Sequence, residues 1–130
     1  MKCSICGKEI KGYGNNPAPL KRDACCDECN AKVIIPLRMY LNEMNTKQLM
    51  TLTTDGCIKI SEKMKEAPLE RLQELVGGYI TIYPKQHPHF LFLVDEEGLL
   101  KKREFNKLAY EILGIEVVGN VVICPRNLFK

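Results

Sequence analysis

Two pairs of cysteines with the spacing Cys-x-x-Cys lie within the first thirty residues of the chain: Cys3 with Cys6, and Cys26 with Cys29. Two residues between the thiols allow the backbone to turn around a single ion. Four thiolates make the tetrahedral ligand set that structural Zn²⁺ prefers. The spacing therefore predicts one structural zinc ion per chain, bound by these four cysteines.

A disulfide framework and free cysteines are the competing interpretations of the same residues. No apolar run of the signal-peptide kind precedes Cys3, and no apolar stretch approaches the roughly 18 residues of a membrane span. We therefore expect a cytoplasmic protein, in which thiols stay reduced. Cys25 remains an alternative ligand to Cys26. We prefer Cys26, because only that residue keeps the two-residue spacing to Cys29.

The first 35 residues contain few large apolar side chains, so a folded segment of this size needs a metal to hold it together. The expected order is a knuckle at residues 3–7, an irregular hairpin over 8–21, and a helix that opens at 26–29. This is the order of elements in a treble-clef zinc finger. Pro36 is expected to end or kink the helix.

The second half of the chain alternates helical and extended patterns. Helical spacing of apolar residues predicts two helices, and β-branched and aromatic runs predict three strands. The helices are expected at residues 68–76 and 105–113, and the strands at 79–83, 90–94 and 117–124. Together they predict an α+β fold with a small, mostly antiparallel sheet of three or four strands and two helices.

These patterns divide the chain into three parts. Residues 1–41 form the zinc-finger lobe, 42–66 a connector with one short strand near 57–61, and 67–130 a small α+β domain. The predicted core of that domain consists of apolar residues from both helices and all three strands: Leu72, Val76, Ile80, Ile82, Leu91, Leu93, Leu108, Ile112 and Val122.

Three longer stretches carry a resemblance. LERLQELVGGYITIYP, FLFLVDEEGLL and NVVICPRN resemble a small domain of unknown function common in bacteriophages, prophages and plasmids of Gram-positive bacteria. The segment CSICGKEIKGYGNNPAPLKRDACCDECNAKVIIP is similar to a short zinc-finger-like segment of phage accessory proteins. The resemblance implies a mobile-element protein of the bacterial cytoplasm. It implies no particular activity and no catalytic residues.

Other reactive side chains are expected to be structural. The loop between strands 79–83 and 90–94 is expected to join them as an antiparallel hairpin. His87 and His89 flank a proline in this loop, and we expect them to be exposed. Cys57 and Cys124 fall in apolar strands, where an unpaired cysteine is usually a small buried hydrophobe.

Three short motifs also favour structural explanations. The acidic turn at residues 95–97 is expected to be solvated, and the basic run 101–103 to form the polar face of a helix. Gly77-Gly78 reads as a helix stop, because it lacks the spacing of a nucleotide-binding loop. No nucleophile lies beside a base in the sequence, so we expect a protein without enzymatic activity.

A loop on the zinc-finger lobe is the candidate recognition element. Tyr13, Asn15 and Asn16 lie in it, and recognition residues concentrate in loops held by rigid scaffolds. Turn formation explains the two asparagines equally well. The candidate contacts for an anionic partner are Lys21, Arg22 and Arg38.

The net charge argues against a strong nucleic-acid interface. The formal charge is +3, and the excess lies in residues 1–41, which hold seven Lys/Arg and four Asp/Glu. Four thiolates with one Zn²⁺ add a net charge of −2, which reduces the total to about +1. A clustered basic face is therefore not expected.

Three classes of function remain. The preferred one is a non-enzymatic binding module whose partner is a host or phage protein, or a second copy of the chain. The second is nucleic-acid binding, and the third is a counter-defence factor that inhibits a host protein or sequesters a small molecule. In the second class, phosphates would be contacted by basic residues of the lobe: Lys8, Lys11, Lys21, Arg22, Lys32 and Arg38.

Overall fold

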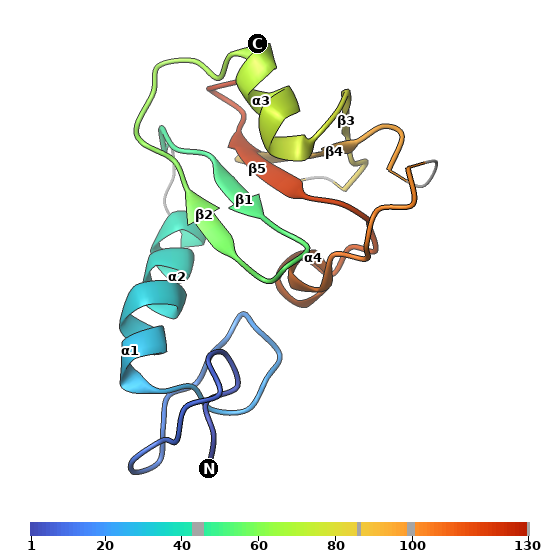
Figure 1. Cartoon of the computed structure of the whole chain (residues 1–130). Helices are drawn as coiled ribbons and strands as arrows, with labels where there is room; N and C mark the ends of the chain where they lie inside the picture. Colours follow the sequence, from blue (N-terminus) through green and yellow to red (C-terminus); the bar gives the residue numbers. More distant parts are fainter. Residues whose placement is uncertain (43–45, 86, 99–100, 130) are drawn as a thin grey trace. The chain divides into compact units, whose positions relative to one another are not determined.

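The computed structural model describes residues 1–42, 46–85, 87–98 and 101–129 (Figure 1). The chain divides into two compact units, Met1–Glu43 and Met44–Lys130. The first contains the cysteine pairs and a helix, and the second contains the sheet. The predicted α+β class is confirmed.

The helix of the first unit runs without interruption through three segments: α1 (Asp27–Cys29), η1 (Asn30–Ile34) and α2 (Ile35–Asn42). Of the two outcomes expected at Pro36, an end of the helix is wrong, because Pro36 lies inside α2, and a kink stays a prediction. A proline inside an α-helix would clash with the carbonyl four residues earlier. Here η1 is a wider π-type turn, closed by the Ile35 N–H on the Asn30 carbonyl. A wider turn directly before Pro36 accommodates its ring and lets the helix continue.

The second unit is built on one five-stranded sheet with the order β2-β1-β5-β4-β3, in which every neighbouring pair is antiparallel. The strands are β1 (Met50–Leu52), β2 (Ile58–Ile60), β3 (Ile80–Ile82), β4 (Phe90–Asp95) and β5 (Val121–Pro125). Figure 1 shows β5 running through the middle of the sheet. The helices of this unit are α3 (Leu69–Val76) and α4 (Lys107–Leu113).

Residues 42–66 contribute more to the sheet than the connector we expected. The predicted short strand is present as β2, but the segment also contains β1, which lies between β2 and β5. All three residues of β1 are buried. Met50 lies opposite Ile123 of β5, so the pairing joins segments far apart in the sequence. The sheet unit therefore begins near residue 44, before the predicted boundary at 67.

The core under α3 contains most of the residues that the apolar pattern predicted. Leu72, Val76, Leu93 and Val122 are buried together there, along with four further side chains: Leu49, Ala67, Cys124 and Leu128. Leu108 of α4 is also buried.

The other predicted core residues are less buried. Ile80, Leu91 and Ile112 are half-buried. The assignment of Ile82 to the core is wrong, since its exposed fraction is 46%. Ile82 lies in β3, an edge strand of the sheet, where packing on neighbouring strands is incomplete.

We expect Leu93→Ala to lower the free energy of unfolding by about 2–5 kcal/mol, because the truncation leaves a cavity in a fully buried position. Ile82→Ala is the matched control, because Ile82 lies opposite Leu93 on the neighbouring strand but is 46% exposed, and it should cost less than about 1 kcal/mol. Urea unfolding of the two variants measures the difference. Equal losses of unfolding free energy in the two variants would contradict this prediction.

Candidate metal centre

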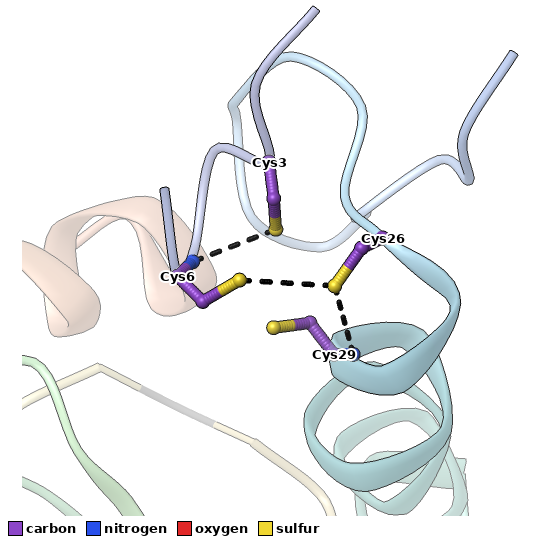
Figure 2. Close-up of side chains that lie close together, drawn as sticks. All are labelled: Cys3, Cys6, Cys26 and Cys29. Carbon is purple, nitrogen blue, oxygen red and sulfur yellow. Dashed lines mark hydrogen bonds between the residues drawn. The ribbon is translucent and has the colours of Figure 1, made fainter. Parts of the chain in front are cut away.

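The four sulfur atoms of Cys3, Cys6, Cys26 and Cys29 all lie within 4.8 Å of one another (Figure 2). The Sγ atoms of Cys6 and Cys26 are 3.7 Å apart. A tetrahedral Zn²⁺ with Zn–S distances of about 2.3 Å has sulfurs separated by about 3.8 Å. The spacing and chemistry of this group, hereafter the four-cysteine cluster, therefore fit a tetrahedral zinc ion.

The first cysteine pair is held by a tight backbone turn. Cys3 Sγ accepts hydrogen bonds from the backbone N–H of Ile5 at 3.4 Å and of Cys6 at 3.5 Å. The Gly7 N–H closes the turn on the Cys3 carbonyl at 3.0 Å. Gly7 has φ +79°, a conformation that side-chain-bearing residues rarely adopt, so the sequence Cys-Gly is what the turn requires.

The second pair lies at the start of the long helix. Cys26 is the N-cap residue of α1, and its Sγ accepts the backbone N–H of Cys29 at 3.5 Å. Asp27 and Glu28 occupy the first turn, as expected for acidic residues at a helix N-terminus. N–H groups at both pairs thus point at sulfur and favour its ionised form.

The electrostatics of the four-cysteine cluster favour a bound cation. Burial alone would raise the pKa of Cys3, but backbone hydrogen bonds from Cys6, Cys26 and Ile5 lower this pKa to about 6. Burial raises the pKa of Cys29, and the neighbouring sulfurs raise it further. One thiolate in this group therefore makes the next one harder to form. A divalent ion removes that opposition, so metal binding should release protons.

Cys25 is not part of the cluster, so among the described residues the geometry favours Cys26 as the ligand. The Cys25 side chain is fully buried. Its backbone forms two hydrogen bonds of 2.9 Å with Asn15, one from each N–H. Burial raises the pKa of this thiol, as expected for a cysteine used in packing.

The candidate recognition loop is held in place by its own asparagines and by Arg38 of α2. Asn15 Nδ2 donates to Asp27 Oδ1 at 2.9 Å, and Asn16 Oδ1 accepts the Ala18 N–H at 3.0 Å. Arg38 binds two carbonyls of the same loop, those of Ala18 and Asn16, each at 2.6 Å. These three predicted contact residues therefore stabilise the loop, whatever else they bind.

Tyr13 and Lys21 differ from these residues. The exposed fraction of Tyr13 is 96%, which is unusual for a large aromatic side chain. Lys21 is also exposed. Arg22 is half-buried, and its guanidinium donates to the Ser4 carbonyl at 3.4 Å. Binding by all six residues stays a prediction, and Tyr13 and Lys21 are the most accessible of them.

The two remaining cysteines, Cys57 and Cys124, differ in burial. Cys124 is fully buried in β5, and burial raises its pKa to about 12. The expectation of a buried Cys57 is wrong: Cys57 is exposed at the turn before β2, where its N–H donates to Thr53 Oγ1 at 2.9 Å. The residue precedes the strand, so it does not pack between neighbours.

The histidines occupy the loop before β4, as predicted, but the expectation that they are exposed is wrong, since both His87 and His89 are half-buried. Its ring centroid lies 5.0 Å from that of Phe90, and its Nδ1 accepts the His89 N–H at 3.1 Å. Burial lowers the pKa of His87, and the nearby His89 and Arg126 lower it further. A neutral, packed imidazole is consistent with a structural role.

A buried ion-pair cluster is the polar feature that the sequence did not reveal. The Asp95 side chain is fully buried and lies 3.2 Å from Lys101 Nζ and 3.3 Å from Arg103 Nη2. It also accepts the Glu97 N–H at 2.8 Å. The expectations of a solvated acidic turn and a basic helix face are therefore wrong at Asp95, Lys101 and Arg103. α4 begins only at Lys107, after the basic run.

The glycine pair after α3 makes room for this cluster. A Cβ on Gly78 would overlap Lys101 Nζ and would lie 3.0 Å from an Asp95 oxygen. Arg103 Nη2 also donates to the Gly77 carbonyl at 2.6 Å. Gly77 ends α3 as predicted, with φ +91°. A side chain at Gly78 would force the ends of the Lys101 and Asp95 side chains to move, which no local pattern could show.

We expect Asp95→Asn to lower the free energy of unfolding at pH 7 by about 1–3 kcal/mol, since charged hydrogen bonds are lost at a buried site. Burial would raise the pKa of Asp95, but the Glu97 amide and the two cations lower it overall. The stabilisation is therefore complete above the unfolded-state pKa of about 4 and is lost as the pH falls through the lower folded pKa.

Urea unfolding between pH 7 and pH 2 measures this dependence. The acid-induced loss of stability should be smaller in Asp95→Asn than in the parent. Glu70→Gln, an exposed substitution on α3, should keep the parent's pH profile. Parallel profiles for the parent and Asp95→Asn would contradict the assignment.

The geometry defines a protein with an N-terminal four-cysteine candidate metal site and an antiparallel α+β domain. Residues 48–127 match the family model described as "Domain of unknown function (DUF3846)", so the chain belongs to this family. The matched range begins just before β1 and ends after β5, whereas the four-cysteine cluster lies outside it.

No curated protein and no solved structure matches the chain. Among the helices of the described residues, none is long and apolar enough to cross a membrane.

Proposed function

We propose that this protein is a non-enzymatic binding protein whose N-terminal unit is held together by one structural Zn²⁺. The convergence of four sulfurs within 4.8 Å supports the proposal most directly. Four protein ligands fill a tetrahedral zinc site, and such a site keeps no position for a water or a substrate. The ion would therefore stabilise the fold and position the loop that carries Tyr13.

The arrangement of polar groups elsewhere agrees with a binding role. Asp95, the most buried carboxylate described, forms ion pairs with Lys101 and Arg103 and accepts a hydrogen bond from a backbone amide. Cys124 is buried with a raised pKa, which disfavours a nucleophilic thiolate. Both groups are used for stability, so neither supports catalysis.

The biological setting that we propose is a phage, prophage or plasmid in a bacterial cytoplasm. This part of the proposal is supported by the resemblance of the sequence motifs alone. The matched family is defined without reference to a role. The genes that flank this one and its relatives provide the test: a setting among ordinary chromosomal genes would contradict a mobile-element origin.

We propose a protein partner for the N-terminal unit, and a nucleic acid is the alternative outcome. Several basic residues of this unit already have acceptors within it. Lys8 and Lys32 lie 4.0 and 3.0 Å from carboxylate oxygens of Glu28, and Arg38 binds two backbone carbonyls. Fewer cations are then available for phosphates, whereas the exposed Tyr13 ring is suited to a protein surface.

The experiment is capture of partners by the zinc-loaded full chain, followed by affinity measurements with each purified partner. Tyr13→Ala should weaken binding at least about tenfold if the ring is an anchor. Lys59→Ala, an exposed change in β2, is the matched control and should bind like the parent. Salt-sensitive gel shifts with DNA or RNA would favour the alternative. Metal-dependent turnover abolished by one substitution outside the four-cysteine cluster would overturn the non-enzymatic proposal.

A further inference from the structure

A groove in the second unit lies between the end of β4 and the segment that precedes β5. Its volume is about 580 Å³, and its described walls include Val94, Glu96, Phe105, Glu116 and Val118. Volumes of about 300–1,000 Å³ are typical of small-molecule sites. The dimensions therefore suit a compact organic ligand better than an extended peptide.

The walls of the groove are held by backbone pairing. Phe105 and Val118 form an antiparallel bridge. The Asn106 N–H donates to the Val117 carbonyl at 2.9 Å, and the Gly119 N–H donates to the Glu104 carbonyl at 2.8 Å. The shape is thus fixed by main-chain hydrogen bonds before any ligand arrives, which lowers the entropy lost on binding.

The backbone of the groove wall is also held in place by the side chain of Asn106. Its fully buried side chain donates to the carbonyls of Leu52 at 2.8 Å and Gly119 at 2.9 Å, and accepts the Ala109 N–H at 2.9 Å. This amide connects β1, the start of α4 and the segment before β5. Phe105, its neighbour, is therefore presented on a rigid backbone although half of its surface is exposed.

The lining combines an apolar surface with negative charge. Valine side chains and the Phe105 ring form the apolar part, and the ring of Tyr110 lies 6.1 Å from that of Phe105. The charged groups of the described lining are all carboxylates: Asp95, Glu96 and Glu116. Asp95 is paired with Lys101 and Arg103, which lie outside the described lining and more than balance its charge, so it offers no negative charge to a ligand. Glu96 and Glu116 are exposed, and no ion pair involves either within the described residues.

We infer that this groove binds a small organic cation, an amine or guanidinium carried on an apolar body. The body would pack on the valines and Phe105, and the cationic head would lie near Glu96 and Glu116. Exposed aromatic faces attract such heads through cation–π contacts. A hydrated metal ion would gain nothing from the apolar walls, because hard cations retain their waters and prefer all-oxygen sites. The site is separate from the four-cysteine cluster, so it can fail while the proposed function holds.

The test uses three probes of one size with different charges: benzylamine, benzyl alcohol and benzoate. They are titrated into the ¹⁵N-labelled, zinc-loaded full chain at low salt. Benzylamine should shift the amide resonances of Glu96, Val117 and Val118, with saturation at millimolar concentration. Benzyl alcohol should bind the same residues more weakly, and benzoate should leave them unchanged.

Substitutions separate the charge from the shape. Glu96→Gln with Glu116→Gln should raise the dissociation constant for benzylamine about 3- to 10-fold and leave that for benzyl alcohol unchanged. Glu66→Gln with Glu70→Gln, at two exposed positions outside the lining, is the control for net charge and should bind like the parent. The folding of each variant is verified from its amide spectrum.

Three results would overturn the inference, and the net-charge control supplies a fourth. These are equal shifts with benzoate and benzylamine, unchanged benzylamine affinity in the folded Glu96/Glu116 variant, or no shift at these amides with benzylamine at tens of millimolar. Weaker binding in both double variants by the same factor would assign the effect to net charge and would overturn it too.

Discussion

Serine in place of Cys6 or Cys29 should abolish stoichiometric zinc binding and unfold the first unit. Each substitution leaves three of the four sulfurs that lie within 4.8 Å of one another. Structural zinc contributes an apparent ~10–16 kcal/mol in small zinc-finger segments, and that binding energy is folding energy. Few large apolar side chains replace it here. The main buried ones described in the first unit are Ile10, Leu20, Ile34, Leu37 and Tyr40.

Zinc content by mass spectrometry under native conditions, together with amide spectra, measures both parts of this prediction. The parent should contain one zinc per chain, and a chelator should reproduce the effect of the serine variants. Resonances of the sheet unit should persist when those of residues 1–42 collapse, since the two units are separately compact.

Two further cysteines serve as controls. Cys25→Ala should keep one zinc per chain, because Cys25 is buried outside the four-cysteine cluster, although the variant should lose stability. Cys57→Ser should keep both zinc and stability, because Cys57 is exposed in the other unit. If Cys25→Ala lost zinc and Cys26→Ser retained it, Cys25 would be the metal ligand in place of Cys26.

Removal of residues 44–66 should abolish cooperative folding of the sheet unit. A chain of residues 44–130 should unfold in one transition, whereas a chain of residues 67–130 should show none. The deletion removes β1 and β2, and with them the buried side chains of Leu49, Met50 and Leu52. It also turns β5, whose five residues are all buried, into an exposed apolar edge.

A substitution in the intact protein tests the same pairing without a deletion. Thr51 is buried in β1, opposite Lys59 of β2 and Val122 of β5. Thr51→Pro should cost about 3 kcal/mol or more, because proline cannot donate to the ladder of a central strand. Thr51→Val, which keeps the backbone donor and the β-branched shape, should cost much less. Cooperative unfolding of residues 67–130 would show that β1 and β2 are dispensable.

The features that could be predicted from the sequence are those set by residues close together in the chain. The Cys-x-x-Cys turns, the glycine that ends α3 and the hairpin of β3 with β4 depend on local geometry. The same holds for the apolar run of β4, which is buried as its composition indicates. In the turns, the helix end and the hairpin the partner lies nearby in sequence, so spacing and turn chemistry determine the contact, whereas the burial of β4 is indicated by its continuous apolar run alone.

The remaining features depend on which distant segments meet. Met50 faces Ile123, and a three-residue strand carries too short a pattern to specify that pairing. Asp95 is buried because Lys101 and Arg103 neutralise it, although its neighbours in sequence indicate a solvated turn.

The sequence by itself thus determined the four-cysteine cluster, the α+β class and most of the core under α3. Tertiary structure decided the central place of β1, the ion pairs of Asp95 and the exposure of Cys57 and Ile82. The physical reason is that the burial of a side chain depends on the strands and loops that pack against it, whereas the sequence pattern around a residue reports only its own strand or helix.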